Sequence, residues 1–266
     1  MSGIEMTSIE LWAQVLAAPN DAQVRGRYVD ALVQEGDRRA EPLLVGAEIE
    51  RRLQNRESYR TEALRKHCEQ LTKAAAEEFA GSLECWGAKL TFVFGWPTEI
   101  TIKARDFVLH AAQIVATIPL RHLNLLSVNE TPEVFQLPQF SQILSLEGSG
   151  QVWSNKAIRA LTESPYLVGL QWLNLSKTGL GDKQVEILAA AENLRGLAQI
   201  DLRNNNCRDP VDAAAGAGYD GNTGAIVLES IYLPPFGLEL ESKYGKIQWL
   251  NVLYNYAAFP LDRYRL

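Results

Sequence analysis

The sequence has few cysteines and histidines, with three of each among its 266 residues. Cys68, Cys85 and Cys207 are too few and too scattered for a disulfide framework, and no CxxC pair suggests a zinc site. None of the histidines stands in HExxH or a comparable ligand spacing. We therefore expect reduced thiols and no bound metal.

The chain also lacks an excess of basic residues and any long apolar run. Lys and Arg number 26 against 32 Asp and Glu, which gives a formal net charge of -6. Nucleic-acid affinity depends on clustered cations, so this balance argues against a nucleic-acid partner. No segment has the length of a membrane span, and the N-terminus has acidic residues where a signal peptide needs basic ones. The prediction is a cytoplasmic protein with no membrane partner.

Motifs for catalysis are missing as well. GAGYDG at 216–221 fits GxGxxG, but a dinucleotide-binding loop joins a strand directly to a helix, and the preceding strand is expected to end near Leu202. The run Gly148–Gly150 lacks the first glycine of GxSxG. We therefore predict no enzymatic activity, no cofactor and no small-molecule substrate.

What the sequence does contain is an internal repeat. In LVGLQWLNLSKTGLGD, residues 167–182, Leu170, Leu173, Leu175 and Leu180 follow a spacing that fits neither a helix nor a plain alternating strand. The L-x-x-L-x-L core recurs in LRHLNLLSV, LAQIDLRNNNC, LESIYL and IQWLNVLYN, and more weakly in PTEITI and SQILSL. The residues that this alignment places at one strand position are Ile100, Leu123, Leu144, Leu173, Ile200, Ile231 and Leu250.

Helix-like stretches separate several copies, at 106–117, 154–164 and 181–194. Asp182 is placed to cap the last of them. One strand and one helix per unit would point the repeat leucines into the space between them. Strands pair about 4.8 Å apart while helices need about 10 Å, so a stack of such units curves with its sheet on the inside.

These copies resemble the leucine-rich repeat family over about residues 97–256. The resemblance implies an α/β fold, a short leucine-rich repeat solenoid with parallel strands on the concave face and helices outside. Thr178 and Val128 stand where the family has an Asn at the ninth repeat position, whose side chain satisfies backbone groups of the turn. The Asn ladder is therefore interrupted.

Residues 1–82 carry no repeat and are expected to form an α-helical N-terminal cap domain. A Pro-Asn-Asp turn at 19–21 precedes a helical stretch that stops at Gly36. A second stretch leads into a charged helix that extends to about Gly81. The predicted domains are this cap, a leucine-rich repeat domain at 83–256 and a C-terminal tail at 257–266.

Part of the cap shows a second resemblance. LAAPND, RYVDAL and EGDRRAE resemble a short bacterial domain that accompanies repeat arrays in planctomycete and myxobacterial proteins. Tyr28, Asp30, Gly36 and Asp37 carry the match. The resemblance implies a companion of repeats and no particular chemistry.

Alternation along the strands selects the residues of the concave face. One column reads Thr101, Asn124, Ser145, Asn174, Asp201, Tyr232 and Asn251. Its neighbour reads Glu99, His122, Ile143, Trp172, Gln199, Ser230 and Trp249. Exposed Trp and Tyr are the usual anchors of protein interfaces. The predicted protein-binding residues are Trp172, Tyr232, Trp249, Asn174, Asp201, His122 and Arg203.

The predicted function is a non-catalytic interaction module that binds another protein through this concave face. Two alternatives stay open: a dedicated inhibitor or immunity protein of one partner, and an enzyme with an unrecognised site, which a polar cluster around His122 would favour. Loops or the C-terminal tail YAAFPLDRYRL could also cover the aromatic rings, above all Trp249.

Overall fold

A computed structural model of the chain describes residues 6–55, 61–208, 217–219, 226–228 and 235–251. The first part of the chain is helical. Its helices are α1 (Ser8–Ala17), α2 (Ala22–Glu35), α3 (Ala40–Gln54) and α4 (Glu62–Cys85). Asp21 caps α2 by accepting hydrogen bonds from the backbone N–H groups of Gln23 and Val24, and Gly36 ends it with φ 67°. The predicted turn and stop of this helix are therefore confirmed.

The rest of the fold is built around a six-stranded, mostly parallel sheet in the order β1-β2-β3-β4-β5-β6. β1 pairs antiparallel with β2, and every later neighbour pairs in parallel. The strands are β1 (Lys89–Val93), β2 (Trp96–Lys103), β3 (His122–Leu126), β4 (Ser145–Glu147), β5 (Trp172–Asn174) and β6 (Gln199–Asp201). Neighbours in sequence are thus neighbours in space, and the class is α/β.

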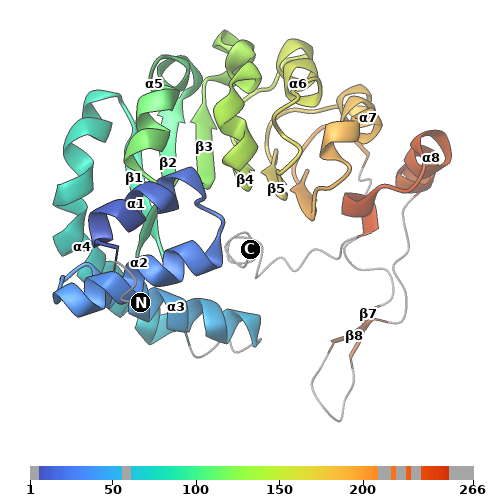
Figure 1. The fold of residues 1–266 in the computed structure, drawn as a ribbon. Coiled ribbons are helices and arrows are strands. Elements are labelled where there is room, and N and C mark those ends of the chain that lie inside the picture. The colour runs from blue at the N-terminus through green and yellow to red at the C-terminus, as the bar shows by residue number, and fades with distance from the viewer. Residues whose placement is uncertain (1–5, 56–60, 209–216, 220–225, 229–234, 252–266) are drawn as a thin grey trace, which may run out of the picture.

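Helices connect the parallel strands and cover one face of the sheet. α5 (Ala104–Thr117), α6 (Asn155–Thr162) and α7 (Asp182–Ala190) lie on the outer side of an arc whose inner side the strands line (Figure 1). We call the sheet face toward these helices the outer face and the opposite one the inner face. The shorter helical segments are η2 (Val128–Glu130), η3 (Pro132–Gln136), η4 (Pro138–Gln142) and η5 (Glu192–Leu194).

The end of the chain departs from the repeat prediction. Residues 248–251 form a short 3-10 helix, η6 (Gln248–Asn251), so the prediction of a strand through Leu250 is wrong. Leu250 is buried in the main core. Ile231 lies outside the described residues. The remaining elements are the hairpin of β7 (Ala217–Tyr219) with β8 (Ile226–Leu228), and α8 (Pro235–Tyr244).

The main core fills the space between the sheet and the outer helices. Its central row takes one residue from each parallel strand, and each is at most 1% exposed. The row consists of Ile100, Leu123, Leu146, Leu173 and Ile200. The alignment is thus confirmed for β2, β3, β5 and β6 and is wrong for β4, where Leu146 takes the place given to Leu144.

A glycine explains the error at β4. Gly148 occupies the position that Leu175 has in the next unit, since each lies two residues after a paired core leucine. The ring of Trp153 fills the space instead, because a Cβ on Gly148 would lie 2.5 Å from Trp153 Cζ2. The large side chain of Trp153 thus compensates for the missing side chain of Gly148, and the β4 segment therefore lacks the leucine spacing.

The turns after the strands repeat more regularly than the leucines do. A residue with positive φ follows the paired positions Asn124, Glu147, Asn174 and Asp201 by three residues in each case. These residues are Ser127 (φ 55°), Gly150 (φ 70°), Lys177 (φ 56°) and Asn204 (φ 58°). Only one of them is Gly, so the sequence gives little sign that the backbone turns alike in all of them.

The turn carbonyls are satisfied although the Asn ladder is interrupted. Asn205 donates through Nδ2 to the Leu175 carbonyl at 2.7 Å and accepts at Oδ1 from the Thr178 backbone N–H at 2.9 Å. Gln151 makes the equivalent contact with the Leu125 carbonyl at 2.6 Å. In the unit between, the Trp153 indole donates to the Gly148 carbonyl at 2.8 Å. Other donors thus replace the expected Asn.

The cap and the sheet share α4 and the β1–β2 turn. Cys68 of α4 packs in a small core with Phe94 of the turn, whereas Leu83 of the same helix belongs to the main core. Trp96 packs with the residues of α1 and α2. The predicted boundary between residues 82 and 83 falls inside α4.

Candidate functional site

The observed strand register rearranges the inner-face columns. One column, the polar row, consists of Thr101, Asn124, Glu147, Asn174 and Asp201. Its neighbour, the His122 column, consists of Glu99, His122, Ser145, Trp172 and Gln199. The predicted columns are therefore wrong at β4: Glu147 replaces Ser145 in the first, and Ser145 replaces Ile143 in the second. Both errors follow from the shifted alignment of that strand.

The aromatic side chains are not placed as a solvent-facing site requires. Trp172 lies on the inner face at the expected register but is only 8% exposed. Trp249 belongs to η6 and is 2% exposed in the main core. The expectation of open rings is thus wrong for both, and the alternative of covered rings describes their burial. Tyr232 lies outside the described residues.

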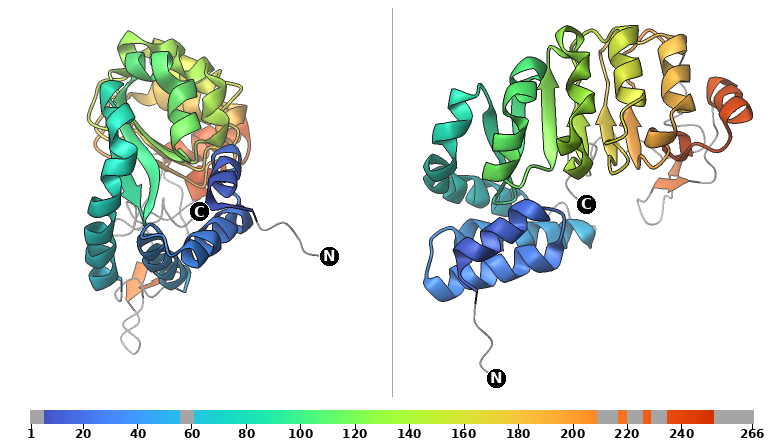
Figure 2. Two further views of the ribbon diagram at one scale, coloured as in Figure 1. Left: turned by 60° about the vertical axis from the view of Figure 1, so that its left-hand side comes forward. Right: turned by 45° about the horizontal axis from the view of Figure 1, so that its top comes forward.

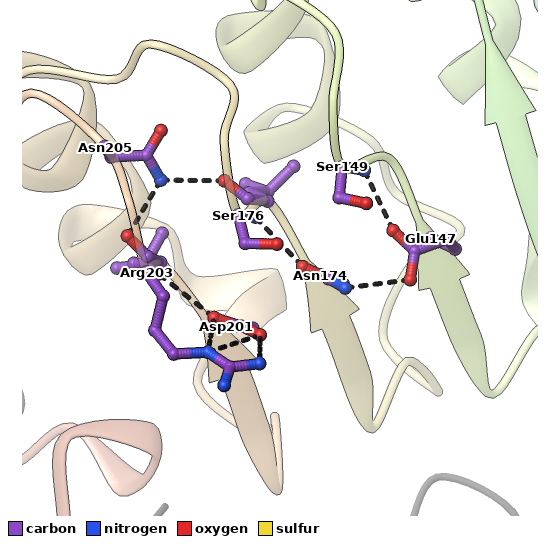
Figure 3. Close-up of polar contacts among 9 residues, drawn as sticks. Glu147, Ser149, Asn174, Ser176, Asp201, Arg203 and Asn205 are labelled. Atoms are coloured by element: carbon purple, nitrogen blue, oxygen red, sulfur yellow. Dashed lines mark hydrogen bonds and ion pairs between the residues drawn. The ribbon is translucent and has the colours of Figure 1, made fainter. Parts of the chain in front are cut away.

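The polar row is held by the same backbone contact in three successive units (Figure 3). Glu147 Oε1 accepts from the Ser149 N–H at 2.9 Å, and Asn174 Oδ1 accepts from the Ser176 N–H at 2.9 Å. Asp201 Oδ1 accepts from the N–H two residues further on, at 3.0 Å. Asx-type contacts of this kind orient a side chain without help from a neighbouring element.

Contacts within the row join its members. Asn174 Nδ2 donates to Glu147 Oε2 at 2.8 Å, which connects β5 to β4. Asp201 is fully buried, and Arg203 Nε donates to its two carboxylate oxygens at 2.9 and 3.0 Å. The side chain of Arg203 remains 33% exposed. The predicted residues Asn174, Asp201 and Arg203 are therefore brought together, and sequence reasoning missed only Glu147 among them.

His122 contacts Ser145 rather than the polar row. Its Nδ1 lies 2.8 Å from Ser145 Oγ, and the two residues are 2% and 3% exposed. Glu99 is the neighbour of His122 on the other side, on β2. A buried His–Ser pair satisfies two polar groups that would otherwise be desolvated without partners. A substrate would reach the Ser145 hydroxyl only if this face opened.

A charged cluster joins the cap to the inner face at the start of β3. Arg121 is 5% exposed and donates through Nε to Asn20 Oδ1 at 2.8 Å. Burial lowers the pKa of Arg121 to about 10, with Arg25 adding to the shift and Glu50 opposing it. Burial also raises the pKa of Glu50 against the opposing charges of Arg25 and Arg121. The Arg121–Asn20 hydrogen bond connects the turn before α2 to the residue before β3, and no sequence pattern pointed to this cluster.

The described part of the chain was searched for metal sites and for membrane-spanning helices. No group of three or more His, Cys, Asp or Glu residues there has an arrangement suited to a metal ion. None of the helices in that part combines the length and apolar character needed to cross a membrane.

Comparisons of the chain with protein-family models, with curated proteins and with solved structures find no match.

Proposed function

We propose that the protein is a non-catalytic module that binds another protein through the inner face of its sheet, and that the sheet and its outer helices form a short leucine-rich repeat solenoid. The equivalent core leucines, the positive-φ turn residue and the contacts of Asn205 support the repeat assignment. In this proposal residues 1–82 form the α-helical N-terminal cap, and the protein acts in the cytoplasm.

The observation that carries the proposal is the preorganisation of the polar row. Glu147 and Asn174 are partly exposed, and each is oriented by a backbone N–H two residues later. Binding that immobilises rotamer-rich side chains costs about 0.5–1.5 kcal/mol for each of them, and side chains already held in place avoid much of this cost. A rigid row of donors and acceptors on adjacent strands suits recognition of a protein surface.

The chemistry of the row indicates the kind of surface it would recognise. Arg203 forms an ion pair with the buried Asp201, and the Glu147 carboxylate accepts hydrogen bonds from the Asn174 amide and the Ser149 backbone N–H. A partner that places a basic side chain opposite Glu147 and a carboxylate or carbonyl opposite the Arg203 guanidinium would match this pattern. Such complementarity mainly supplies specificity and association rate.

The test is affinity capture from the source cells with the full chain, followed by titration of the captured protein against variants. Asn174→Ala and Glu147→Gln remove one amide and one charge from the row. Gln113→Ala, on the exposed surface of α5, is the matched amide control. We expect each row variant to weaken binding about tenfold or more and the control to bind like wild type. If Asn174→Ala and Glu147→Gln bind the captured protein as tightly as wild type does, the binding site does not lie on the inner face.

The captured protein also distinguishes the inhibitor or immunity alternative. An enzyme or toxin whose activity stops on binding would favour a dedicated inhibitor, whereas a partner that remains active would favour an interaction module.

The His122–Ser145 contact favours one second candidate, a hydrolase that uses the Ser145 hydroxyl as nucleophile. This candidate predicts turnover of an activated ester by the wild-type chain and its loss in Ser145→Ala. Equal turnover by the two proteins would eliminate it.

A further inference from the structure

A groove runs between two outer helices on the side of the sheet away from the polar row. α6 and α7 lie side by side there (Figure 2). Tyr244 at the end of α8 contributes to the lining of the groove. The groove has a volume of about 490 Å³. Its lining residues are Asn155, Arg159, Thr162, Lys183, Glu186, Ile187, Ala190, Ala191 and Tyr244.

The charge of this groove is opposite to that of the chain as a whole. Arg159 and Lys183 are both exposed, and neither forms an ion pair with another residue that the structure describes. The single lining carboxylate, Glu186, is paired with Lys243 at 2.9 Å. The groove therefore presents two uncompensated cations in a chain whose net charge is -6.

The remaining lining of the groove includes apolar side chains, two of which are small alanines. Ile187 and Tyr244 are half-buried, and the two alanines beside them leave room for a partner to approach the backbone of α7. Lys183 lies in the first turn of α7 and Ala190 ends the helix, so the apolar lining residues of α7 lie toward its C-terminal end. Nine residues of helix span about 13 Å, which is two to three turns of a bound helix.

We infer that this groove binds an acidic amphipathic helix of a partner protein. The carboxylates of that helix lie against Arg159 and Lys183, and its leucine-type side chains lie against Ile187 and Tyr244. Helix-in-groove recognition uses this combination of an apolar stripe and complementary charge. The inference is independent of the polar row, because the two surfaces lie on opposite sides of the sheet.

The probe is a fluorescent 15-residue helical peptide that carries two Glu at one end of a face and two Leu two turns away on the same face. A sister peptide has Gln in place of both Glu. Fluorescence anisotropy with the full chain should show saturable binding of the acidic peptide. The sister peptide should bind about tenfold or more weakly.

Variants of the chain locate the binding. The double variant Arg159→Glu/Lys183→Glu should lose about tenfold or more in affinity for the acidic peptide, and added salt should weaken wild-type binding. Lys156→Glu makes the same kind of charge change on α6 at an exposed position that does not line the groove. This control should bind almost as wild type does.

A bulky side chain in the apolar part of the groove provides a second test of peptide binding, because it blocks the groove without changing its charge. Ala190 is exposed, so Ala190→Trp should block the groove while the circular dichroism spectrum and melting temperature stay as in wild type. The inference is overturned if wild type does not bind the acidic peptide, if Lys156→Glu weakens binding as much as the double variant, or if a folded Ala190→Trp binds with unchanged affinity.

Discussion

The two faces of the sheet use the same strands in different ways. On the outer face, Leu123, Leu146 and Leu173 are interchangeable apolar side chains that are at most 1% exposed. On the inner face, Asn124, Glu147 and Asn174 follow them by one residue, and of these three only Glu147 is charged. The outer face has one requirement, which is to fill a dry space. The inner face is where one unit differs from the next, so it is the part that can specify a partner.

The largest effect should come from the outer-face row. Leu173→Ala should lower the free energy of unfolding by about 2–5 kcal/mol, because a fully buried large side chain leaves a cavity between β5 and the outer helices. Urea denaturation measures this loss. The adjacent substitution Asn174→Ala should cost about 1 kcal/mol or less, since its side chain is partly exposed. Equal losses in the two variants would mean that the faces are not distinct.

A smaller effect is expected where the outer-face pattern has a gap. Gly148→Ala should destabilise by about 1–3 kcal/mol, because the new methyl group would collide with the Trp153 ring at 2.5 Å. Thermal unfolding of this variant, with Gly196→Ala as control, checks the account, since a Cβ on Gly196 meets nothing within 4 Å. A stabilised Gly148→Ala would show that Trp153 does not fill this position.

The next largest loss of stability should come from the turn after β6, which contains Asn205. Asn205→Ala should cost about 1–2 kcal/mol, because the carbonyls of Leu175 and Leu202 lose their donor and the Thr178 N–H loses its acceptor. Asn206→Ala, at an exposed neighbour, is the control for urea denaturation. If both variants unfold at the same urea concentration, Asn205 has no ladder role.

The smallest effect lies outside both faces, in the cap. Hydrogen bonds from Arg51 and then Arg52 lower the pKa of Glu48 from the ordinary 4.5 to about 2. The ionised carboxylate thus stabilises the fold above pH 4.5, and this contribution is lost as the pH falls toward about 2. Glu48→Gln should be slightly less stable than wild type at neutral pH, and the difference should shrink over that range. A difference that stays constant through the range would contradict the assignment.

Local signals allowed much of the fold to be predicted from the sequence. Asp21 and Gly36 bound α2 because a capping side chain favours a helix start and a residue with positive φ favours a helix end, and both are local sequence signals. The leucine spacing predicted the register of β2, β3, β5 and β6 because each unit closes its own part of the core. The predicted register of β4 was wrong because the Trp153 ring fills the space that a leucine at position 148 would occupy. A search for leucines does not detect this replacement.

The site was predicted less completely, because burial is decided by contacts between distant parts of the chain. Strand alternation brought Asn174 and Asp201 to one face, but no local pattern reveals that Trp172 is covered. Glu147 was missed with the register of β4. The spacing from Glu147 to Ser149, which repeats that from Asn174 to Ser176, could have found it.

The central claim is that the polar row contacts a partner protein and that the exposed surface of α5 does not. The most direct measurement places a photo-crosslinking amino acid at Asn174 or, as control, at Gln113 of α5, and identifies the products in the source cells. The account predicts that one protein is crosslinked from position 174 and not from position 113. Crosslinking of that protein only from position 113, or equally from both, would contradict the account.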